Sequence, residues 1–245
     1  MNTLQPVAVV LGVGAEAGLG AALCRRFAAA GHHVFVAGRT LEKLERVAES
    51  VVGAGGSATA ISCDATSEAD VIALYEQIEN ESGGAPDLAV YNAGNSISGR
   101  IRDMSAEDFE NAWRILCLGG FLFGREATRR MLPKGGTLLF TGASASLRGR
   151  SGFGAFNSGK AALRILAQAM AKEYAAEGLH VAHVVIDGGI AGQRQIDRLG
   201  RNLNEGEQAR MISLEGLAEA YWQLHCQPPT AWTFELDVRT AQESW

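Results

Sequence analysis

The sequence has little of several residue types, and each shortage argues against a class of protein. Its four cysteines, at positions 24, 63, 117 and 226, are widely spaced and form no Cys-x-x-Cys pair, so we expect free thiols in a reducing cytoplasm and no metal site. Basic residues are not in excess: the net charge is −5 and no basic run occurs, which argues against nucleic acid as a partner. No apolar run is long enough to span a membrane, and the N-terminus lacks a positively charged leader region. The sequence therefore predicts a cytoplasmic protein that binds neither nucleic acid nor membrane.

The apolar content is high enough for a large core, at 47% apolar and 20% charged residues. No low-complexity linker and no internal repeat divides the 245 residues, so we expect one domain over residues 1–245. Short apolar runs alternate with helical patterns along the chain. We expect strands at 7–12, 34–37, 58–61, 88–91, 137–141, 181–186 and 231–238, and helices at 19–30, 41–48, 71–78, 109–131 and 156–174. This alternation is typical of an α/β fold: a doubly wound parallel sheet, here of about seven strands, with helices on both faces.

Distinct motifs stand where these expected strands end. A glycine-rich turn, 12–20, joins the first strand to the first helix, and Tyr91-Asn92-Ala93-Gly94 follows the fourth strand. The small residues 141–146 follow the fifth strand, and Phe156 then stands four residues before Lys160 on an Ala-rich helix. Together, over nearly the whole chain, these motifs resemble the short-chain dehydrogenase/reductase family. The resemblance implies a Rossmann-type fold, a nicotinamide cofactor and the interconversion of an alcohol and a carbonyl compound.

The resemblance is incomplete at the family's catalytic set of Asn, Ser, Tyr and Lys. The matching positions are Cys117, Ala143, Phe156 and Lys160, so only the lysine is retained. In the family the tyrosine donates a proton, while the lysine lowers its pKa and holds the nicotinamide ribose. A phenyl ring has no proton to give. We therefore interpret the chain as an oxidoreductase of this type with an altered or weak proton relay.

Several residues near these positions allow two interpretations. Lys160 is either a surface lysine or, given apolar neighbours such as Leu163 and Ile165, a buried contact to the cofactor ribose, which we favour. Ser144 is a candidate for bonding a substrate carbonyl, although serines in such turns more often bond locally. Tyr91 is a candidate replacement acid, but packing at a strand end is the preferred interpretation. Cys117 is best interpreted as an unreactive buried thiol.

The glycine-rich turn is expected to bind the cofactor pyrophosphate at the N-terminus of the first helix. Gly18 and Gly20 match the last two glycines of the family's T-G-x-x-x-G-x-G pattern, and either Gly12 or Gly14 is the first; the threonine is absent in both alignments. A tight turn with no nucleotide is the alternative. Including the tetrapeptide after the fourth strand and residues discussed next, the candidate cofactor-binding residues are Gly12, Gly14, Gly18, Leu19, Gly20, Arg39, Asp64, Asn92, Ala93, Gly94, Lys160, Gly188, Gly189 and Ile190.

Cofactor choice depends on the end of the second strand. Gly38 stands where an NAD-selective fold usually has an acidic residue, and Arg39 follows it. A guanidinium can pair with a 2′-phosphate, so we expect NADP(H) rather than NAD(H), against the alternative of a solvated arginine. Asp64 resembles the family's adenine-binding Asp; capping of the next helix is the rival interpretation, for which Ser67 is equally suited.

The segment after the sixth strand corresponds to the family's substrate region. Gly188, Gly189 and Ile190 are expected to pass close to the nicotinamide, and Asp187 replaces a proline. The polar stretch 191–215 matches the family's variable lid, whose arginines either meet an acidic substrate or are simply solvated. The family assembles through helices and the last strand, which implies a homodimer or homotetramer.

Two functions of different class remain. The first is an NADP(H)-dependent oxidoreductase acting on a small carbonyl or alcohol substrate. The second is a non-catalytic NADP(H)-binding sensor or scaffold, favoured by the three replaced catalytic residues. A third, weaker possibility is a cofactor site that no longer binds.

Overall fold

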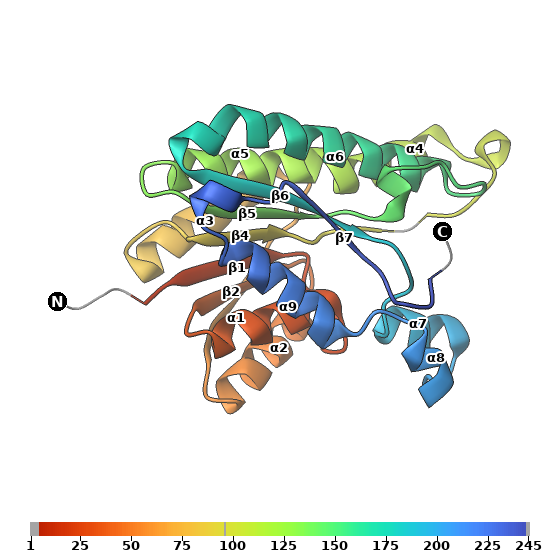
Figure 1. Ribbon diagram of the computed structural model, residues 1–245, viewed down its shortest axis with the longest axis horizontal. Helices are drawn as coiled ribbons and strands as arrows, with labels where there is room; N and C mark the ends of the chain where they lie inside the picture. Colours follow the sequence, from red (N-terminus) through yellow and green to blue (C-terminus); the bar gives the residue numbers. More distant parts are fainter. Residues whose placement is uncertain (1–4, 96, 244–245) are drawn as a thin grey trace.

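The computed structural model describes residues 5–95 and 97–243 as a three-layer α/β arrangement (Figure 1). The strands are β1 (Val7–Leu11), β2 (His33–Gly38), β3 (Ser57–Ser62), β4 (Leu88–Tyr91), β5 (Gly136–Thr141), β6 (Leu179–Ile186) and β7 (Glu235–Val238). They form one parallel sheet of seven strands in the order β3-β2-β1-β4-β5-β6-β7. The predicted α/β class and Rossmann-type parallel sheet are therefore confirmed.

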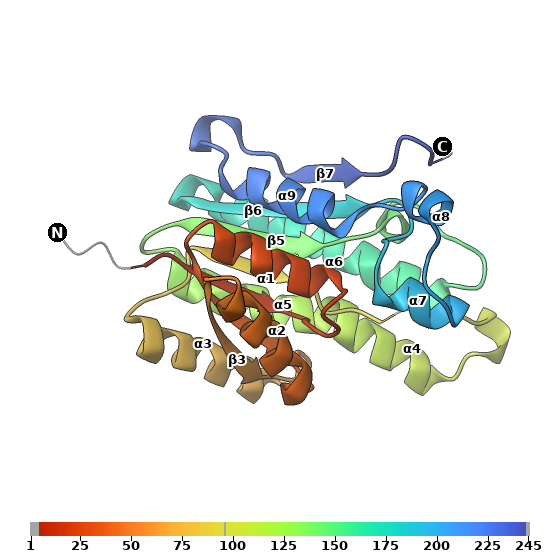
Figure 2. The same ribbon diagram turned by 90° about the horizontal axis from the view of Figure 1, so that it is seen from below.

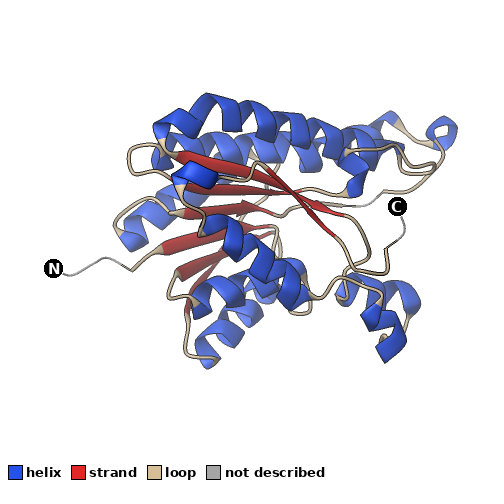
Figure 3. Ribbon diagram, in the orientation of Figure 1, coloured by secondary structure: helices blue, strands red, loops and turns tan. Residues whose placement is uncertain are grey.

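Helices cover both faces of this sheet, as Figure 3 shows by colour. They are α1 (Leu19–Ala29), α2 (Leu41–Gly53), α3 (Glu68–Ser82), α4 (Ala106–Trp113), α5 (Gly119–Met131), α6 (Gly154–Tyr174), α7 (Gln193–Leu199), α8 (Glu205–Ala209) and α9 (Leu214–His225). Short helical turns add η1 (Ile101–Asp103), η2 (Arg114–Leu118), η3 (Ser144–Ser146), η4 (Ala175–Glu177) and η5 (Pro229–Ala231). The apolar side chains of α1, α2 and α9 pack on one face of the sheet, and those of α3, α5 and α6 pack on the other. The inner strands are buried on both faces, which explains their continuous apolar runs.

Two expected elements differ in the structure. The helix predicted over 109–131 is interrupted by η2, a π-helical turn at Arg114–Leu118. The last strand, expected over 231–238, begins only at Glu235, because η5 precedes it and the ring of Trp232 stacks on His180 at 4.9 Å between centroids. Periodicity alone does not show either interruption, since both segments keep their apolar spacing.

The carboxyl ends of the strands all meet at one edge of the sheet, where α7 and α8 project beyond it (Figures 1 and 2). In open α/β sheets this edge is where ligands bind, at the point where the strand order reverses. Here the reversal lies between β1 and β4. None of the helices within 5–95 and 97–243 has both the length and the hydropathy to cross a bilayer. The leader-region expectation falls partly on residues 1–4, outside the described residues.

Candidate cofactor and active site

The turn after β1 shows why glycine stands at its two ends. Gly12 has a φ of 105°, and a Cβ there would lie 2.2 Å from the backbone N of Ala93. A Cβ on Gly20 would lie 2.9 Å from Cα of Val13. A Cβ on Gly14, by contrast, would meet no described atom within 4 Å. Gly12 is thus the glycine that permits the tight turn against β4, while Gly14 leaves open space beside the N-terminus of α1.

Asn92, at the end of β4, joins three strands by hydrogen bonds. Its Nδ2 donates to O of Gly12 at 3.0 Å, and its Oδ1 accepts from Oγ1 of Thr141 at 3.1 Å. The buried hydroxyl of Tyr221 on α9 donates to the same Oγ1 at 2.8 Å. These bonds fix the carboxyl ends of β1, β4 and β5 relative to one another. The glycine turn and the Asn92-Ala93-Gly94 segment are therefore held together.

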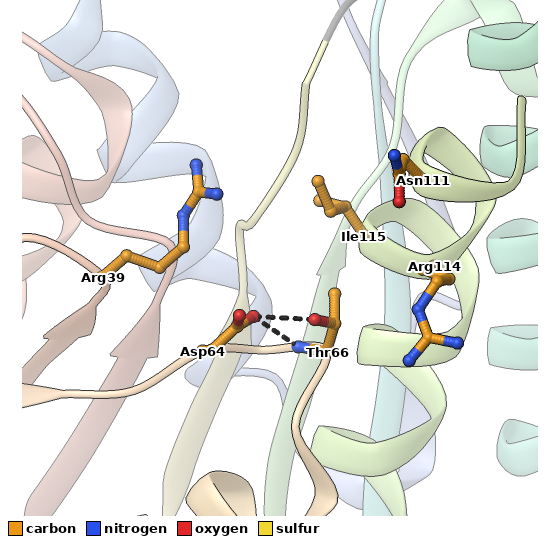
Figure 4. A pocket seen from close by; sticks show the side chains of 6 residues that line it. All are labelled: Arg39, Asp64, Thr66, Asn111, Arg114 and Ile115. Carbon is orange, nitrogen blue, oxygen red and sulfur yellow. Dashed lines mark hydrogen bonds between the residues drawn. The ribbon is translucent and has the colours of Figure 1, made fainter. Parts of the chain in front are cut away.

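A pocket of about 310 Å³ lies at the ends of β2 and β3 (Figure 4). It is lined by Arg39, Asp64, Thr66, Asn111, Arg114 and Ile115. Figure 4 shows Arg39 on one wall and Arg114 on the opposite wall, with Asp64 and Thr66 between them. Within the described residues Arg39 has no ion pair, so its charge is available to a ligand.

Asp64 is not the cap of the following helix. Its Oδ1 accepts from the backbone N and the Oγ1 of Thr66, both at 2.9 Å. Ser67 is the N-cap of α3, since its Oγ accepts from N of Asp70 at 3.3 Å. The capping alternative for Asp64 is therefore wrong, and its carboxylate lines the pocket instead.

Lys160 is buried at the centre of this edge. Its side chain is on α6, the residue is 4% exposed, and Nζ donates to O of Thr141 at 2.5 Å. A Cβ on Gly94 would lie 3.8 Å from Nζ, so the ammonium is beside the Asn92-Ala93-Gly94 segment. Burial, with a smaller effect from Arg194, lowers the pKa of Lys160 to about 8. The expected burial of Lys160 is confirmed, but Ile165, one of the apolar neighbours on which that expectation rests, is 57% exposed.

The positions of the other catalytic residues have different surroundings. Phe156 is half-buried and packs against Ala112, Leu116 and Ala155. Cys117 is half-buried in the π-helical turn η2, and burial raises the pKa of its thiol. π-helical turns often occur at functional sites, because they change the direction in which side chains point.

The turn after β5 contains the serine candidates. Ala143 precedes η3, and Oγ of Ser146 donates to the carbonyl oxygen of Ala143 at 2.6 Å. The hydroxyl of Ser146 is therefore used in a hydrogen bond within the turn. The half-buried Ser144 makes no side-chain hydrogen bond with any described residue. Of the two serines, only Ser144 keeps its hydroxyl for a ligand.

Tyr91 is a packing residue, as expected, rather than an accessible acid. It is fully buried, its hydroxyl donates to O of Ile115 at 2.5 Å, and burial raises the pKa of its phenol. This bond also holds the π-helical turn η2 against the end of β4. A replacement of Asn by Tyr in the tetrapeptide therefore has a structural explanation.

The segment after β6 is fixed at both ends. The carboxylate of Asp187 is buried and pairs with Arg148 at 3.0 Å and with Arg239 at 3.2 Å. Gly188 and Gly189 lead to Ile190, which bridges to Ile212 across the base of the lid. The backbone N of Gln193, the first residue of α7, donates to O of Ala17 in the glycine turn at 2.7 Å. The lid is thus attached directly to the turn expected to hold the pyrophosphate.

Sequence reasoning missed part of this site. Thr141 and Tyr221 belong to no recognisable motif. Thr141 is the polar residue that ends an apolar strand, and this position could have marked it as a site residue. Asn111, Arg114 and Ile115 lie in and just before the π-helical turn, which brings them to the pocket wall. No sequence pattern marks such a turn, so these residues had no detectable signal.

Comparison with known proteins agrees with this arrangement. Residues 8–195 match the family model for short chain dehydrogenases. The uncharacterized oxidoreductase YuxG of Bacillus subtilis is 34% identical over 75% of this chain, which spans only 27% of that protein's length. Sorbitol-6-phosphate 2-dehydrogenase of Escherichia coli is 32% identical over 75% of this chain and 71% of its own length.

A solved structure gives the same result over more of the chain. The crystal structure of a short-chain dehydrogenase from Rhodopseudomonas palustris is 35% identical, with a TM-score of 0.81, and covers 96% of this chain and 98% of its own. The residues matched by the family model, 8–195, run from β1 into α7 and include the glycine turn, the segment Asn92-Ala93-Gly94 and Lys160. The chain therefore belongs to the short-chain dehydrogenase/reductase family, whose members are oxidoreductases that use NAD or NADP.

Proposed function

We propose that this chain is an NADP(H)-dependent oxidoreductase that interconverts a small carbonyl compound and its alcohol with a weak or altered proton relay. The observation that carries the proposal is the buried ammonium of Lys160, held by O of Thr141 beside Gly94. A charged amine is costly to bury without several partners, and among residues 5–95 and 97–243 this one has a single acceptor. Ribose hydroxyls of a bound dinucleotide would supply the remaining acceptors. Burial of an under-bonded charge at a ligand edge is typical of a functional site.

The surrounding residues fit a dinucleotide. The open space beside Gly14 lies at the N-terminus of α1, where backbone N–H groups favour a pyrophosphate. Asp64 offers acceptor oxygens in the pocket that would take the adenosine part. Arg39 supports NADP(H), because a guanidinium binds a phosphate by paired hydrogen bonds and no acidic residue replaces it at the end of β2.

The chain's own residues would bind and orient, while the bound nicotinamide would supply the hydride. Lys160 would hold the ribose, and the hydroxyl of Ser144 would donate to a substrate carbonyl oxygen. Proton donation is the weak step, because Phe156 has no acidic hydrogen. A positioned general acid typically contributes ~10²–10⁴-fold, so slow turnover is expected rather than none. Lys160, with a pKa of about 8, retains a proton at neutral pH that it can release.

Calorimetric titration with NADPH and NADH tests the cofactor. We expect NADPH to bind at least about tenfold more tightly, corresponding to about 1.4 kcal/mol, and Arg39→Ala to remove most of this preference. Arg46→Ala is a matched control, since Arg46 is exposed on α2 and, within the described part of the chain, its side chain bonds only the carbonyl oxygen of Glu42. Equal affinities for the two cofactors in the parent protein would reject the NADP(H) assignment. Failure of both to bind would reject the function itself.

Binding without turnover is the second candidate function, and one observation favours it. Phe156 contributes to an apolar cluster with Leu116 and Ala155, so the place of the proton donor is filled by packing. Single-turnover measurements with NADPH and a broad panel of ketones and aldehydes separate the two candidates. Oxidation of NADPH by any carbonyl compound supports the enzyme, whereas tight binding with no oxidation supports a sensor or scaffold.

We also propose that the chain forms a homodimer or homotetramer through the outer surface of α4 to α6. Large apolar side chains are exposed there: Phe109 at 43%, Trp113 at 39%, Phe121 at 40% and Ile165 at 57%. Clustered exposed apolar residues commonly mark protein interfaces. Light scattering after size exclusion should show a dimer or tetramer, and Ile165→Glu with Phe121→Glu should shift it toward monomer. A monomeric parent protein at micromolar concentration would contradict this assembly.

A further inference from the structure

Three side chains with metal-binding atoms converge at the edge of the sheet opposite the cofactor site. His32 lies between α1 and β2, Asp87 directly precedes β4, and His225 is the last residue of α9. One nitrogen or oxygen from each lies within 4.8 Å of the other two. The amino ends of the strands and the carboxyl end of α9 gather at the left in Figure 1, far from α7 and α8. This cluster is therefore separate from the residues that the proposed function uses.

The separations suit a tetrahedral ion. Two ligand atoms that are each 2.0–2.1 Å from a zinc ion lie about 3.3 Å apart in a tetrahedron. Nε2 of His32 is 3.3 Å from Oδ2 of Asp87, which is long for a hydrogen bond between these groups. Nε2 of His225 is 3.9 Å from the same oxygen. The three ligand atoms lie within 4.8 Å of one another, so the His225 ring has to move toward His32 and Asp87 to complete three tetrahedral positions.

The outer atoms of two of these side chains are already fixed by other groups. Nδ1 of His225 bonds Oγ1 of Thr137 at 3.0 Å, and Oδ1 of Asp87 accepts from the backbone N of Val7 at 3.0 Å. Such bonds leave Nε2 of His225 and Oδ2 of Asp87 pointing to a common place. In metal sites this outer support orients the ligands and is nearly as important as the ligands themselves.

The three side chains differ in exposure, and the most exposed of them leaves a path by which an ion can enter. The side chain of His32 is 4% exposed and that of His225 is 16% exposed, whereas Asp87 is 43% exposed. The ring of Trp222 covers the two histidines, with centroids 5.6 Å and 5.3 Å from theirs. An ion would therefore enter from the Asp87 side, where a water molecule can take the fourth position.

We propose that His32 Nε2, Asp87 Oδ2 and His225 Nε2 form a zinc-binding site that ties the end of α9 to the amino ends of β2 and β4. Two imidazoles and one carboxylate are a ligand set that zinc accepts. The expectation of no metal site rested on the spacing of the cysteines. These three ligands are far apart in the chain and form no spacing motif, so only the fold brings them together.

Cobalt titration of the full-length protein, after dialysis against EDTA, tests the site. We expect one equivalent of Co²⁺ to bind with the visible absorption of a tetrahedral complex, quench Trp222 fluorescence and be displaced by Zn²⁺. Trp222→Phe should lose that quenching but keep the cobalt uptake. Zinc at about 100 times its Kd should raise the melting temperature by about 5–10 °C.

Variants assign the ligands. His225→Ala and Asp87→Asn should each weaken Co²⁺ binding at least about 100-fold, because loss of outer support alone costs 10–100-fold. His33→Gln is the matched control: His33 adjoins His32 but bonds Ser57 and Thr59 instead, so binding should be unchanged. Asp87→Asn keeps an oxygen for the N–H of Val7 and should fold even if His225→Ala does not. Parent protein that takes up no Co²⁺ at millimolar concentration, or equal weakening in His33→Gln and Asp87→Asn, would overturn the site.

Discussion

At the scale of single residues, Phe156 is the position that most limits the proposed chemistry. It stands one helical turn before Lys160, whose ammonium would lower the pKa of a phenol placed there. We expect Phe156→Tyr to raise the rate of NADPH oxidation by small ketones or aldehydes on the order of 10²-fold. Adding Ala143→Ser should raise it further, since that hydroxyl would orient the carbonyl.

Phe121→Tyr is the control for this experiment, because Phe121 lies on α5, is 40% exposed and has the guanidinium of Arg125 over its ring. It adds the same hydroxyl outside the catalytic position and should leave the rate unchanged. If Phe156→Tyr binds NADPH but reduces no member of the panel, the substrate pocket differs from the family in shape as well as in residues.

Lys160 should make the ligand-free protein less stable than an uncharged side chain of similar size would. Its folded pKa of about 8 is below the ordinary value of 10.5, so the unfolded state binds more protons between these two values. The free energy of unfolding of the parent protein therefore rises as the pH rises from about 8 to about 10.5, because the cost of burying the charged lysine disappears. We expect Lys160→Met to melt higher than the parent at pH 7 and to lose that advantage by pH 10. Thermal melting from pH 6 to 10 checks this, and a constant difference across the range would contradict it.

Where a motif constrains the backbone, the sequence indicates individual residues, although their binding of a cofactor stays a prediction. Asn92 and, as an alternative to Gly14, Gly12 were indicated in this way, and the structure brings the two together. Thr141 and Tyr221 were not indicated, since their contribution is a hydrogen bond between segments 80 residues apart. The proposed zinc ligands His32, Asp87 and His225 are likewise far apart in the sequence and form no motif. Contacts between side chains so far apart in the sequence can be seen only in the folded structure.

At the scale of elements, α3 and α5 are joined by ion pairs around one buried carboxylate. Glu126 on α5 is 2% exposed and pairs with Arg125, Arg129 and Arg130. Arg125 and Arg130 also reach Glu68 and Glu79 on α3. The carboxylate thus positions arginines that connect two helices.

We expect Glu126→Gln to lower the free energy of unfolding by about 2 kcal/mol, because a charged acceptor for three guanidinium groups is lost. Glu79→Gln should cost less, since Glu79 is 38% exposed and has one of these partners. Urea unfolding of the two variants measures the difference. A larger loss from Glu79→Gln would show that the surface pair, not the buried carboxylate, joins the helices.

The elements themselves were largely predictable, and their interruptions were not. The inner strands are buried and keep continuous apolar runs, so they were located from these runs. The edge strands β3 and β7 are less buried, and the start of β7 was placed too early. The π-helical turn at Arg114–Leu118 arises from one extra residue accommodated within a helix, stabilised by the bond from Tyr91 to Ile115. The helical spacing of apolar residues in the sequence does not reveal such an insertion.

At the scale of the whole molecule, acid should unfold the chain through buried histidine. His183 on β6 is fully buried and bonds Glu235 at 3.1 Å, and burial lowers its pKa to about 4. Unfolded chain takes up this proton near pH 6.5, whereas the folded chain does not until about pH 4. Stability is therefore complete above pH 6.5 and falls as the pH decreases toward 4, by about 3 kcal/mol for this group.

Melting in EDTA between pH 4.5 and 7.5 tests the acid dependence without any contribution from metal. The parent should show a decreasing melting temperature below pH 6.5, and His183→Gln should show a shallower decrease. Identical pH profiles for the two proteins would exclude His183 as a source of acid sensitivity.

The bond between Gln193 and Ala17 has a kinetic consequence. It joins the first turn of the lid to the glycine turn, so a dinucleotide that immobilises the turn would also fix where the lid begins. Substrate would then meet an ordered surface only after the dinucleotide has bound. Steady-state kinetics should accordingly show a compulsory order of addition, with NADPH first and the carbonyl compound second.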